Sequence, residues 1–283
     1  MRSSVRSKKF LRLFVSYAIL TFVAVAIIYP LLWTIGASLN PGNSLISTTL
    51  IPKKPTLDHY RELFAGKESL LYERWYWNSM KISFFTMLGS VISVSFTAYA
   101  FSRFRFKGRR NALTLFLLLQ MVPQFSALIA LFVLAQMLGM LNSHWLLILL
   151  YIGGQIPMNT YLMKGYMDSI PRDLDESAKI DGASNTRIFF QILLPLSKPM
   201  IAVVAMNGFT GPLGDFVLSS AILRTPDAYT LPIGLYNLVN EVMGASYTTF
   251  AAGALLISIP VAIVFLMLQR NFVSGLTLGG IKG

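Results

Sequence analysis

The longest uncharged stretch of this sequence lies between Arg110 and Lys164, where no Asp, Glu, Lys or Arg occurs. A soluble domain carries charges at much shorter intervals, because about a quarter of its residues are charged. The one polar, glycine-containing interruption is MLGMLNSH, at 137–144. Because a helix needs ~20 apolar residues to cross a bilayer, the stretch has room for two spans. The sequence therefore predicts a tight helical hairpin in a membrane.

Composition supports a membrane location for the whole chain. Of its 283 residues, 54% are hydrophobic and only 13% are charged, and the mean hydropathy is +0.60. We expect an all-α integral membrane protein with one transmembrane domain over 1–283. Its six predicted spans are 15–38, 82–101, 112–139, 145–163, 200–223 and 250–268. The first span follows a basic arm, as a secretory signal does, but its apolar core exceeds the usual ~7–15 residues and predicts a retained helix.

Basic residues predict the orientation of these spans. Most of the 24 Lys and Arg residues fall in the amino-terminal arm, in SRFRFKGRRN after the second span, between the fourth and fifth spans, or in the tail. The positive-inside rule places all four segments in the cytoplasm, with both termini. The net charge of +12 then reflects topology in a lipid bilayer, and no nucleic-acid partner is expected.

Several kinds of active site are excluded by the residues present. The chain has no cysteine and two distant histidines, His59 and His144, so no metal centre is expected. The histidines are predicted to be loop or interfacial residues. Neither G-x-x-x-x-G-K-[ST] nor H-E-x-x-H occurs, and the acids cluster in loops. We expect a protein that is not an enzyme and has no cofactor of its own.

A polar segment, DESAKIDGASNTRIFFQILLP, interrupts the apolar pattern at 175–195. Acidic residues precede a glycine break at Gly182, and Ser184 can cap a second helix. That helix has an apolar face formed by Ile188, Phe189, Ile192 and Leu193. The sequence predicts two short helices joined at Gly182, which together project from the membrane.

The same segment resembles the cytoplasmic EAA loop of ABC importer permeases. The matching residues are Glu176, Ala178, Asp181, Gly182, Ile192, Leu194 and Pro195, with Ser177 in place of the usual first alanine. Other stretches, including AYAFSRFRFKGRR, YTLPIGL and GLTLGGIKG, are similar to the carbohydrate-uptake branch, most of all to the smaller maltose/maltodextrin permease subunits. The resemblance covers essentially the whole chain.

This resemblance implies a multi-pass subunit of the bacterial cytoplasmic membrane. Its expected partners are a second homologous permease, a pair of cytoplasmic ATPases that use ATP, and an extracytoplasmic sugar-binding protein. The loop, at about 168–199, would supply the coupling helix that contacts the ATPases. The residues implied in coupling are Glu176, Ser177, Ala178, Asp181, Gly182 and Ala183, with Asp181 bonding backbone amides of the turn. The tail would also contact the ATPases, through Gly275, Gly279, Gly280 and Lys282.

Polar residues inside the spans are candidates for a sugar path. Asp215 is the only acid within a span and follows Asn207 and Gly211 in MNGFTGPLGDF. A charge at bilayer depth usually faces an internal cavity. The alternative for this stretch is glycines that serve helix packing and an acid near the outer interface. Weaker candidates are Gln120, Gln124, Gln155 and Asn159, each of which could instead form an interhelical hydrogen bond.

The predicted function is that of a permease subunit for oligosaccharides, with maltose or maltodextrin as the main expectation. The alternatives are a permease for another oligosaccharide, of the raffinose or galactoside type, or an autonomous secondary transporter.

Overall fold

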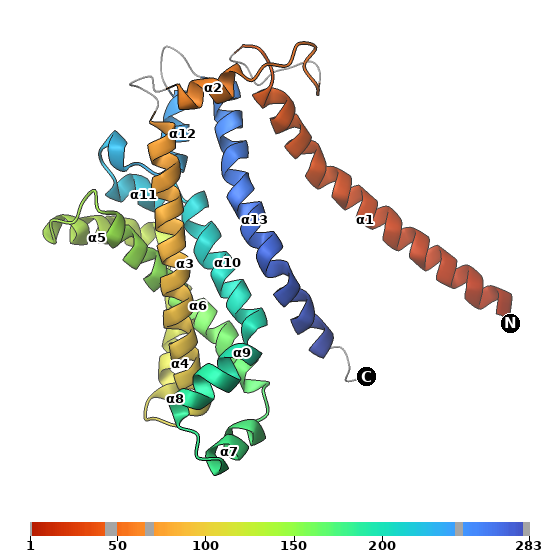
Figure 1. Cartoon of the computed structure of the whole chain (residues 1–283), viewed down its shortest axis with the longest axis vertical. Coiled ribbons are helices and arrows are strands. Elements are labelled where there is room, and N and C mark those ends of the chain that lie inside the picture. Colours follow the sequence, from red (N-terminus) through yellow and green to blue (C-terminus); the bar gives the residue numbers. More distant parts are fainter. Residues whose placement is uncertain (1, 43–49, 66–70, 241–245, 280–283) are drawn as a thin grey trace. The chain divides into compact units, whose positions relative to one another are not determined.

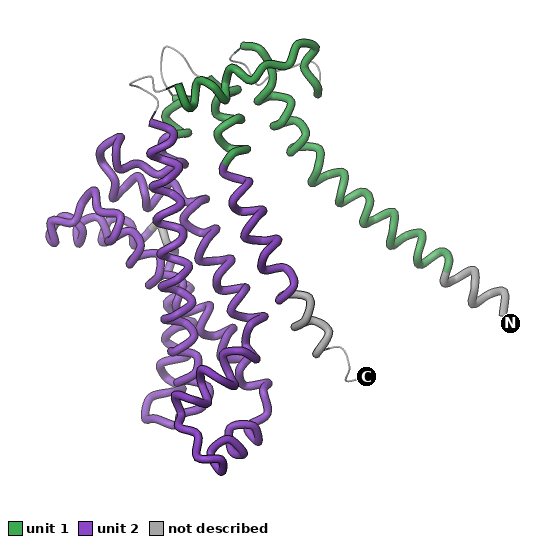
Figure 2. Tube along the Cα trace, in the orientation of Figure 1, with its two compact units in different colours: residues 1–70, 235–256 green, residues 71–234, 257–283 purple. Residues whose placement is uncertain are grey.

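A computed structural model describes residues 2–42, 50–65, 71–240 and 246–279, with the side chains of 10–42, 50–65, 71–123, 126–240 and 246–271. The described chain is helical and divides into two compact units (Figures 1 and 2). Unit 1 comprises 1–70 and 235–256, and unit 2 comprises 71–234 and 257–283. The predicted all-α class agrees with these helices.

Unit 1 contains α1 (Arg2–Ser38), α2 (Asp58–Phe64), most of α12 (Leu231–Asn240) and the start of α13 (Tyr247–Gly279). His59 of α2 is 5% exposed, and its Nε2 lies 2.9 Å from the carbonyl oxygen of Asn40. Its Nδ1 lies 3.4 Å from the hydroxyl of Thr248, which donates to the carbonyl of Gly42. His59 thus lies in the connection that follows α1, as expected, but it is buried in a short helix and joins three segments of this unit. An interfacial position stays a prediction.

Unit 2 is built around α3 (Tyr72–Arg103), α6 (His144–Asp168) and α10 (Lys198–Gly214), which pack against one another (Figure 1). Small side chains allow the close approach of α3 and α10. A Cβ atom on Gly208 would lie 2.7 Å from the Cα of Met87, so only glycine fits there without a shift of the backbone. Such small-residue contacts are typical of helices that pack within a membrane.

Four helices are long and apolar enough to span a membrane: Phe10–Ser38, Tyr72–Arg103, His144–Asp168 and Tyr247–Asn271. A fifth candidate is a pair of segments, Asn185–Leu196 and Lys198–Gly214, bent by 79° at Ser197. Four of the six predicted spans thus correspond to long continuous helices. The number six is not confirmed, and the cytoplasmic location of both termini stays a prediction.

The third predicted span, 112–139, is not one helix. It consists of α4 (Arg109–Leu119) and α5 (Gln124–Met137), separated by a turn that ends at Pro123. Proline lacks an N–H group and disfavours helical backbone in the residue before it, which explains the break. The expected turn after α5 is present, with positive φ at Gly139 and Asn142. However, α5 packs on α11 (Val217–Ile222) and not along α6 as a hairpin.

The fifth predicted span, 200–223, also ends early. Helix α10 stops at Gly214, and Asp215 has extended backbone with φ −87° and ψ 121°. The Asp215 carboxylate accepts hydrogen bonds from the backbone N–H groups of Leu218 and Ser219 at 3.4 and 3.0 Å. A carboxylate that caps the next helix favours this break, because it satisfies N–H groups that have no partner within that helix.

The remaining elements of unit 2 connect α6 to α10 and α11 to α12. The first set is α7 (Asp173–Ile180), α8 (Asn185–Ile188), a π-helical turn (Phe189–Leu193) and α9 (Leu194–Leu196). The second is a 3-10 turn, Pro226–Ala228, which is fixed to α3 by side-chain hydrogen bonds. Its Pro226 carbonyl accepts from Trp75 Nε1 at 2.8 Å.

Candidate functional site

The predicted pair of short helices is present as α7 and α8. Gly182 joins them with φ +80°, a left-handed conformation that costs a residue with a Cβ atom about 1–2 kcal/mol. The hydroxyl of Ser184 accepts from the N–H of Arg187 at 3.3 Å, so the predicted cap is confirmed. Three acidic residues lie in the first turn of α7, where the helix dipole favours them.

The proposed coupling residues fall into two groups. Glu176, Ser177 and Asp181 are exposed, whereas Ala178 and Ala183 are half-buried and pack against the hydrophobic core beneath them. Ile180, at 87% exposure, adds an apolar side chain to the outward surface of α7.

The expected role of Asp181 differs from the structure. Its carboxylate accepts no hydrogen bond within the described part of the chain. The turn is instead closed by backbone bonds, from Gly182 N to Lys179 O at 3.0 Å and from Ala183 N to Ala178 O at 2.9 Å. This is the pattern of a glycine-terminated helix, which needs no side chain.

The second short helix is held by its apolar face, as predicted. Ile188, Phe189 and Leu193 are at most 2% exposed and share a core with residues of α3 and α6. The ring of Phe189 lies 4.8 Å from that of Tyr99, measured between centroids. The helix is therefore anchored, while α7 projects from it (Figure 1).

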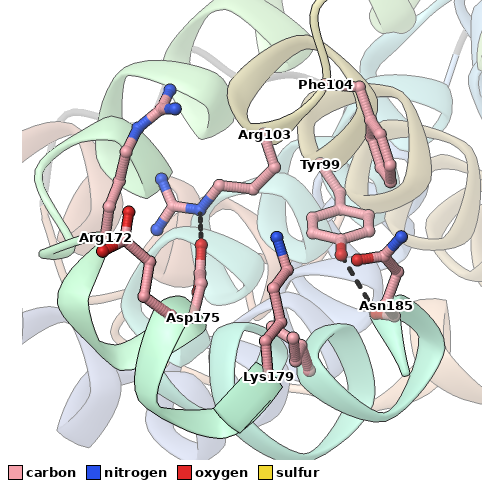
Figure 3. A pocket seen from close by; sticks show the side chains of 9 residues that line it. Tyr99, Arg103, Phe104, Arg172, Asp175, Lys179 and Asn185 are labelled. Atoms are coloured by element: carbon pink, nitrogen blue, oxygen red, sulfur yellow. Dashed lines mark hydrogen bonds and ion pairs between the residues drawn. The ribbon is translucent and has the colours of Figure 1, made fainter. Parts of the chain in front are cut away.

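A buried ion pair that the sequence does not predict lies beneath α7. Arg103 Nε lies 2.5 Å from Asp175 Oδ2, and the two side chains are 7% and 9% exposed. They line a cavity of about 140 Å³ with Tyr99, Arg172 and Lys179 among its walls, and they point toward one another (Figure 3). The sequence identifies Arg103 only as one of the basic residues after the second predicted span, and Asp175 only as one of the acidic residues before Gly182. The position of Asp175 three residues before Ala178, on the inward side of α7, was the available signal.

Further polar contacts close the ends of the neighbouring helices. Tyr99 donates to the carbonyl of Asn185 at 3.0 Å, and Ser102 donates to Asp168 Oδ1 at 2.7 Å. The other carboxylate oxygen of Asp168 accepts from Lys164 at 2.5 Å. The ends of α3 and α6 and the start of α8 are thus connected through polar side chains.

A second candidate region lies along α6 and α10, and we call it the polar ladder. Three residues spaced four apart come from α6 and three from α10 and the residue that follows it, and this spacing places those within each helix on one face. The members are Tyr151, Gln155 and Asn159 of α6, and Asn207, Gly211 and Asp215, which run along α10 to its carboxyl end. The ladder extends about 12 Å along each helix, near the middle of α6 and at the carboxyl end of α10.

Hydrogen bonds join the two end rungs of the ladder. Asn207 Nδ2 donates to Asn159 Oδ1 at 3.1 Å. Tyr151 donates its hydroxyl to Asp215 Oδ2 at 2.6 Å. The structure therefore brings together residues that the sequence suggested separately, and it adds Tyr151, which precedes Gln155 by one helical turn.

The middle rung pairs Gly211 with Gln155. A Cβ atom on Gly211 would lie 3.3 Å from Gln155 Nε2, so the glycine makes room for the amide. Asn207 and Gly211 are exposed, Gln155 is half-buried, and Asn159 is 4% exposed. A polar, exposed strip on otherwise apolar helices is costly against lipid and therefore favours a facing subunit or water.

Other predicted residues are not gathered with these. Gln120 is exposed at the turn after α4, outside the ladder, and the side chain of Gln124 lies outside the described set. In the tail, Gly275 and Gly279 belong to the last turns of α13, whereas Gly280 and Lys282 lie outside the described residues. Their contact with ATPases stays a prediction.

The sequence matches known transport proteins. Residues 87–277 match the model of the family described as the binding-protein-dependent transport system inner membrane component. The galactooligosaccharides transport system permease protein GanQ of Bacillus subtilis (strain 168) is 80% identical over all of both chains. The maltodextrin transport system permease protein MdxG of the same organism is 45% identical over 95% of each chain.

A solved structure supports the fold. A crystal structure of a bacterial ABC transporter involved in the import of the acidic polysaccharide alginate contains a chain that matches with a TM-score of 0.75. It is 22% identical and covers 92% of this chain and 95% of its own. With the family match over most of the sequence and the apolar helices of both units, the chain belongs to the inner membrane components of binding-protein-dependent transport systems.

Proposed function

We propose that this chain is a permease subunit of an ATP-driven importer for oligosaccharides of the galactooligosaccharide class. One observation carries the choice of sugar: the 80% identity to a galactooligosaccharide permease extends over the whole chain, against 45% to maltodextrin permeases. This favours the galactoside alternative over the maltose or maltodextrin expectation. An autonomous secondary transporter does not fit a family defined by dependence on a binding protein.

In this proposal the subunit forms the path with a second, homologous permease. A binding protein delivers the sugar outside, and a pair of cytoplasmic ATPases supplies the energy of ATP. The exposed Glu176, Ser177 and Ile180 of α7 give the ATPases a surface of mixed polarity to contact. Movement of α7 shifts the spans between outward and inward states, which is alternating access.

The polar ladder lines the path in this proposal. Sugar hydroxyls need donors and acceptors, and the exposed amide of Asn207 and the half-buried amide of Gln155 supply both. Neutral amides suit an uncharged sugar, and the one acid of the ladder, Asp215, already bonds Tyr151 and the start of α11. Gly211 keeps the middle of the strip free of a side chain.

The test is uptake of labelled galactooligosaccharide by cells that lack their own importer and express this chain with its neighbouring transport genes. We expect ATP-dependent uptake that unlabelled galactooligosaccharide inhibits strongly, and that maltodextrin and raffinose inhibit weakly. Stronger inhibition by maltodextrin would return the assignment to the maltodextrin class. Uptake that persists without the binding protein would contradict the importer itself.

A further inference from the structure

Arg103 lies where three elements of unit 2 meet. It ends α3, and its guanidinium donates to the carbonyls of Met167 at 3.0 Å and Ile170 at 3.1 Å, at the end of α6 and just beyond it. Its Nε pairs with Asp175 of α7. One side chain therefore connects a span, the end of a second span and the projecting helix (Figure 3).

Asp175 is the only buried residue of α7. Every other side chain of that helix is exposed or half-buried, and of these Ala178 packs against the hydrophobic core. The neighbouring Arg172 adds a bond from its guanidinium to the carbonyl of Ser102 at 3.0 Å. The contacts of Arg172 and Asp175 thus both lead to residues at the end of α3.

The chemistry of the pair suits a rigid link. A guanidinium is planar and carries five donors in a fixed fork, so it holds several acceptors at once in one geometry. Each buried charge requires the other, because an unpaired ion away from water is strongly disfavoured. Separation of α7 from α3 would break this pairing, and the two elements therefore tend to move together.

We propose that the Arg103–Asp175 ion pair is the link that carries movement of α7 into the transmembrane helices. Arg103 and Asp175 are positioning residues, which touch no substrate. From Arg103 the movement passes to α3, which packs along both α6 and α10, the helices that carry the polar ladder. This inference rests on the proposed function, since it concerns how the importer is coupled.

Replacement of both residues by apolar ones distinguishes a structural role of the ion pair from a coupling role. A structural role predicts unchanged uptake per ATP, and a coupling role predicts lower uptake per ATP. Exchange of a buried ion pair for apolar residues of similar volume often leaves a protein as stable as before. Arg103→Met combined with Asp175→Leu therefore removes the link without leaving a lone buried charge. The matched control is Asp173→Asn, which removes an exposed acid from the same helix.

The experiment uses the whole importer, purified through a tag on this chain and reconstituted in vesicles with its binding protein. Galactooligosaccharide uptake and ATP hydrolysis are measured together. For the apolar pair, and for Asp175→Asn alone, we expect uptake per ATP to fall by about tenfold, which corresponds to about 1.4 kcal/mol of lost coupling. Asp173→Asn should match the wild type.

An apolar pair that transports sugar at the wild-type ratio would overturn the inference. Wild-type vesicles without ATP-driven uptake would instead contradict the proposed function, so the two failures are distinguishable. Reduced uptake with an unchanged ratio to ATP hydrolysis would also count against a coupling role.

A second pair of substitutions tests the inference if the importer with Arg103→Met and Asp175→Leu assembles poorly. The chain contains no cysteine, so Arg103→Cys with Asp175→Cys creates the only two thiols of this subunit. A short, reducible bis-methanethiosulfonate reagent can bridge them, because the natural pair spans a longer distance than a disulfide. We expect bridging to raise uptake per ATP and reduction to lower it again. Equal ratios before and after bridging would refute the link.

Discussion

The Arg103–Asp175 ion pair beneath α7, which we call the junction, and the polar ladder use polar groups in opposite ways. At the junction, two full charges are buried and paired at 2.5 Å. In the ladder the amides of Asn207 and Gln155 are neutral and remain exposed or half-buried. Buried charges fix a geometry because their separation leaves each ion unpaired away from water, which costs several kcal/mol of free energy. Accessible amides, in contrast, can exchange one hydrogen-bond partner for another. The surface that we propose to transmit movement and the surface that we propose to line the sugar path therefore differ in their chemistry.

The largest expected effect is on stability, and it comes from breaking the ion pair at the junction. Arg103→Ala leaves Asp175 as an uncompensated buried charge, and we expect the free energy of unfolding to fall by about 3–5 kcal/mol. Denaturant unfolding of the purified chain in detergent micelles measures this. Arg103→Met with Asp175→Leu should recover most of the loss. A change below about 1 kcal/mol for Arg103→Ala would show that the charges are solvated, not paired.

Asn159 marks the buried edge of the ladder and should behave more like the junction. Asn159→Ala removes the acceptor of Asn207 and leaves space in a side-chain position that is 4% exposed. We expect a loss of about 1–3 kcal/mol in the same unfolding measurement. Unchanged stability would mean that the ladder is solvated at both of its edges.

Gly182 tests whether the turn after α7 depends on backbone conformation alone. No atom lies within 4 Å of a Cβ built there, so a substitution meets strain from φ +80° and no clash. We expect Gly182→Val to cost about 1–2 kcal/mol and to lower uptake, and Gly182→Asn to cost less, because Asn tolerates this region. Equal effects of Val and Asn on uptake would point to a contact made by the glycine surface instead.

Asn207 lies on the exposed side of the ladder and should affect transport as well as stability. For Asn207→Ala we expect the unfolding free energy to fall by about 1 kcal/mol, because the Asn207 side chain is exposed but the buried Asn159 Oδ1 loses its donor. The KM for sugar uptake should rise about fivefold, the equivalent of one lost hydrogen bond of ~1 kcal/mol. Thr210→Ala is the control, since that hydroxyl bonds its own helix at Met206. An unchanged KM for Asn207→Ala would contradict the proposal that the ladder lines the sugar path.

The membrane class, four long apolar helices and the two short helices joined at Gly182 follow from the sequence alone. These features depend on local properties, namely runs of apolar residues, a cap at Ser184 and a glycine where φ is positive. The motif residues around Glu176 were likewise contiguous, and they suggested the transporter family that the comparisons then showed.

Which distant residues contact one another depends on the packing of the helices. Arg103 and Asp175 are 72 positions apart, and nothing in a basic loop or an acidic first turn distinguishes a buried partner from a solvated one. The spacing of four residues along α6 and α10 was visible in the sequence, but the register that pairs Asn159 with Asn207 was not. The break at Pro123 and the role of Asp215 as a cap also depend on how neighbouring segments satisfy their backbone groups. Local chemistry fixes the elements, whereas packing determines their partners.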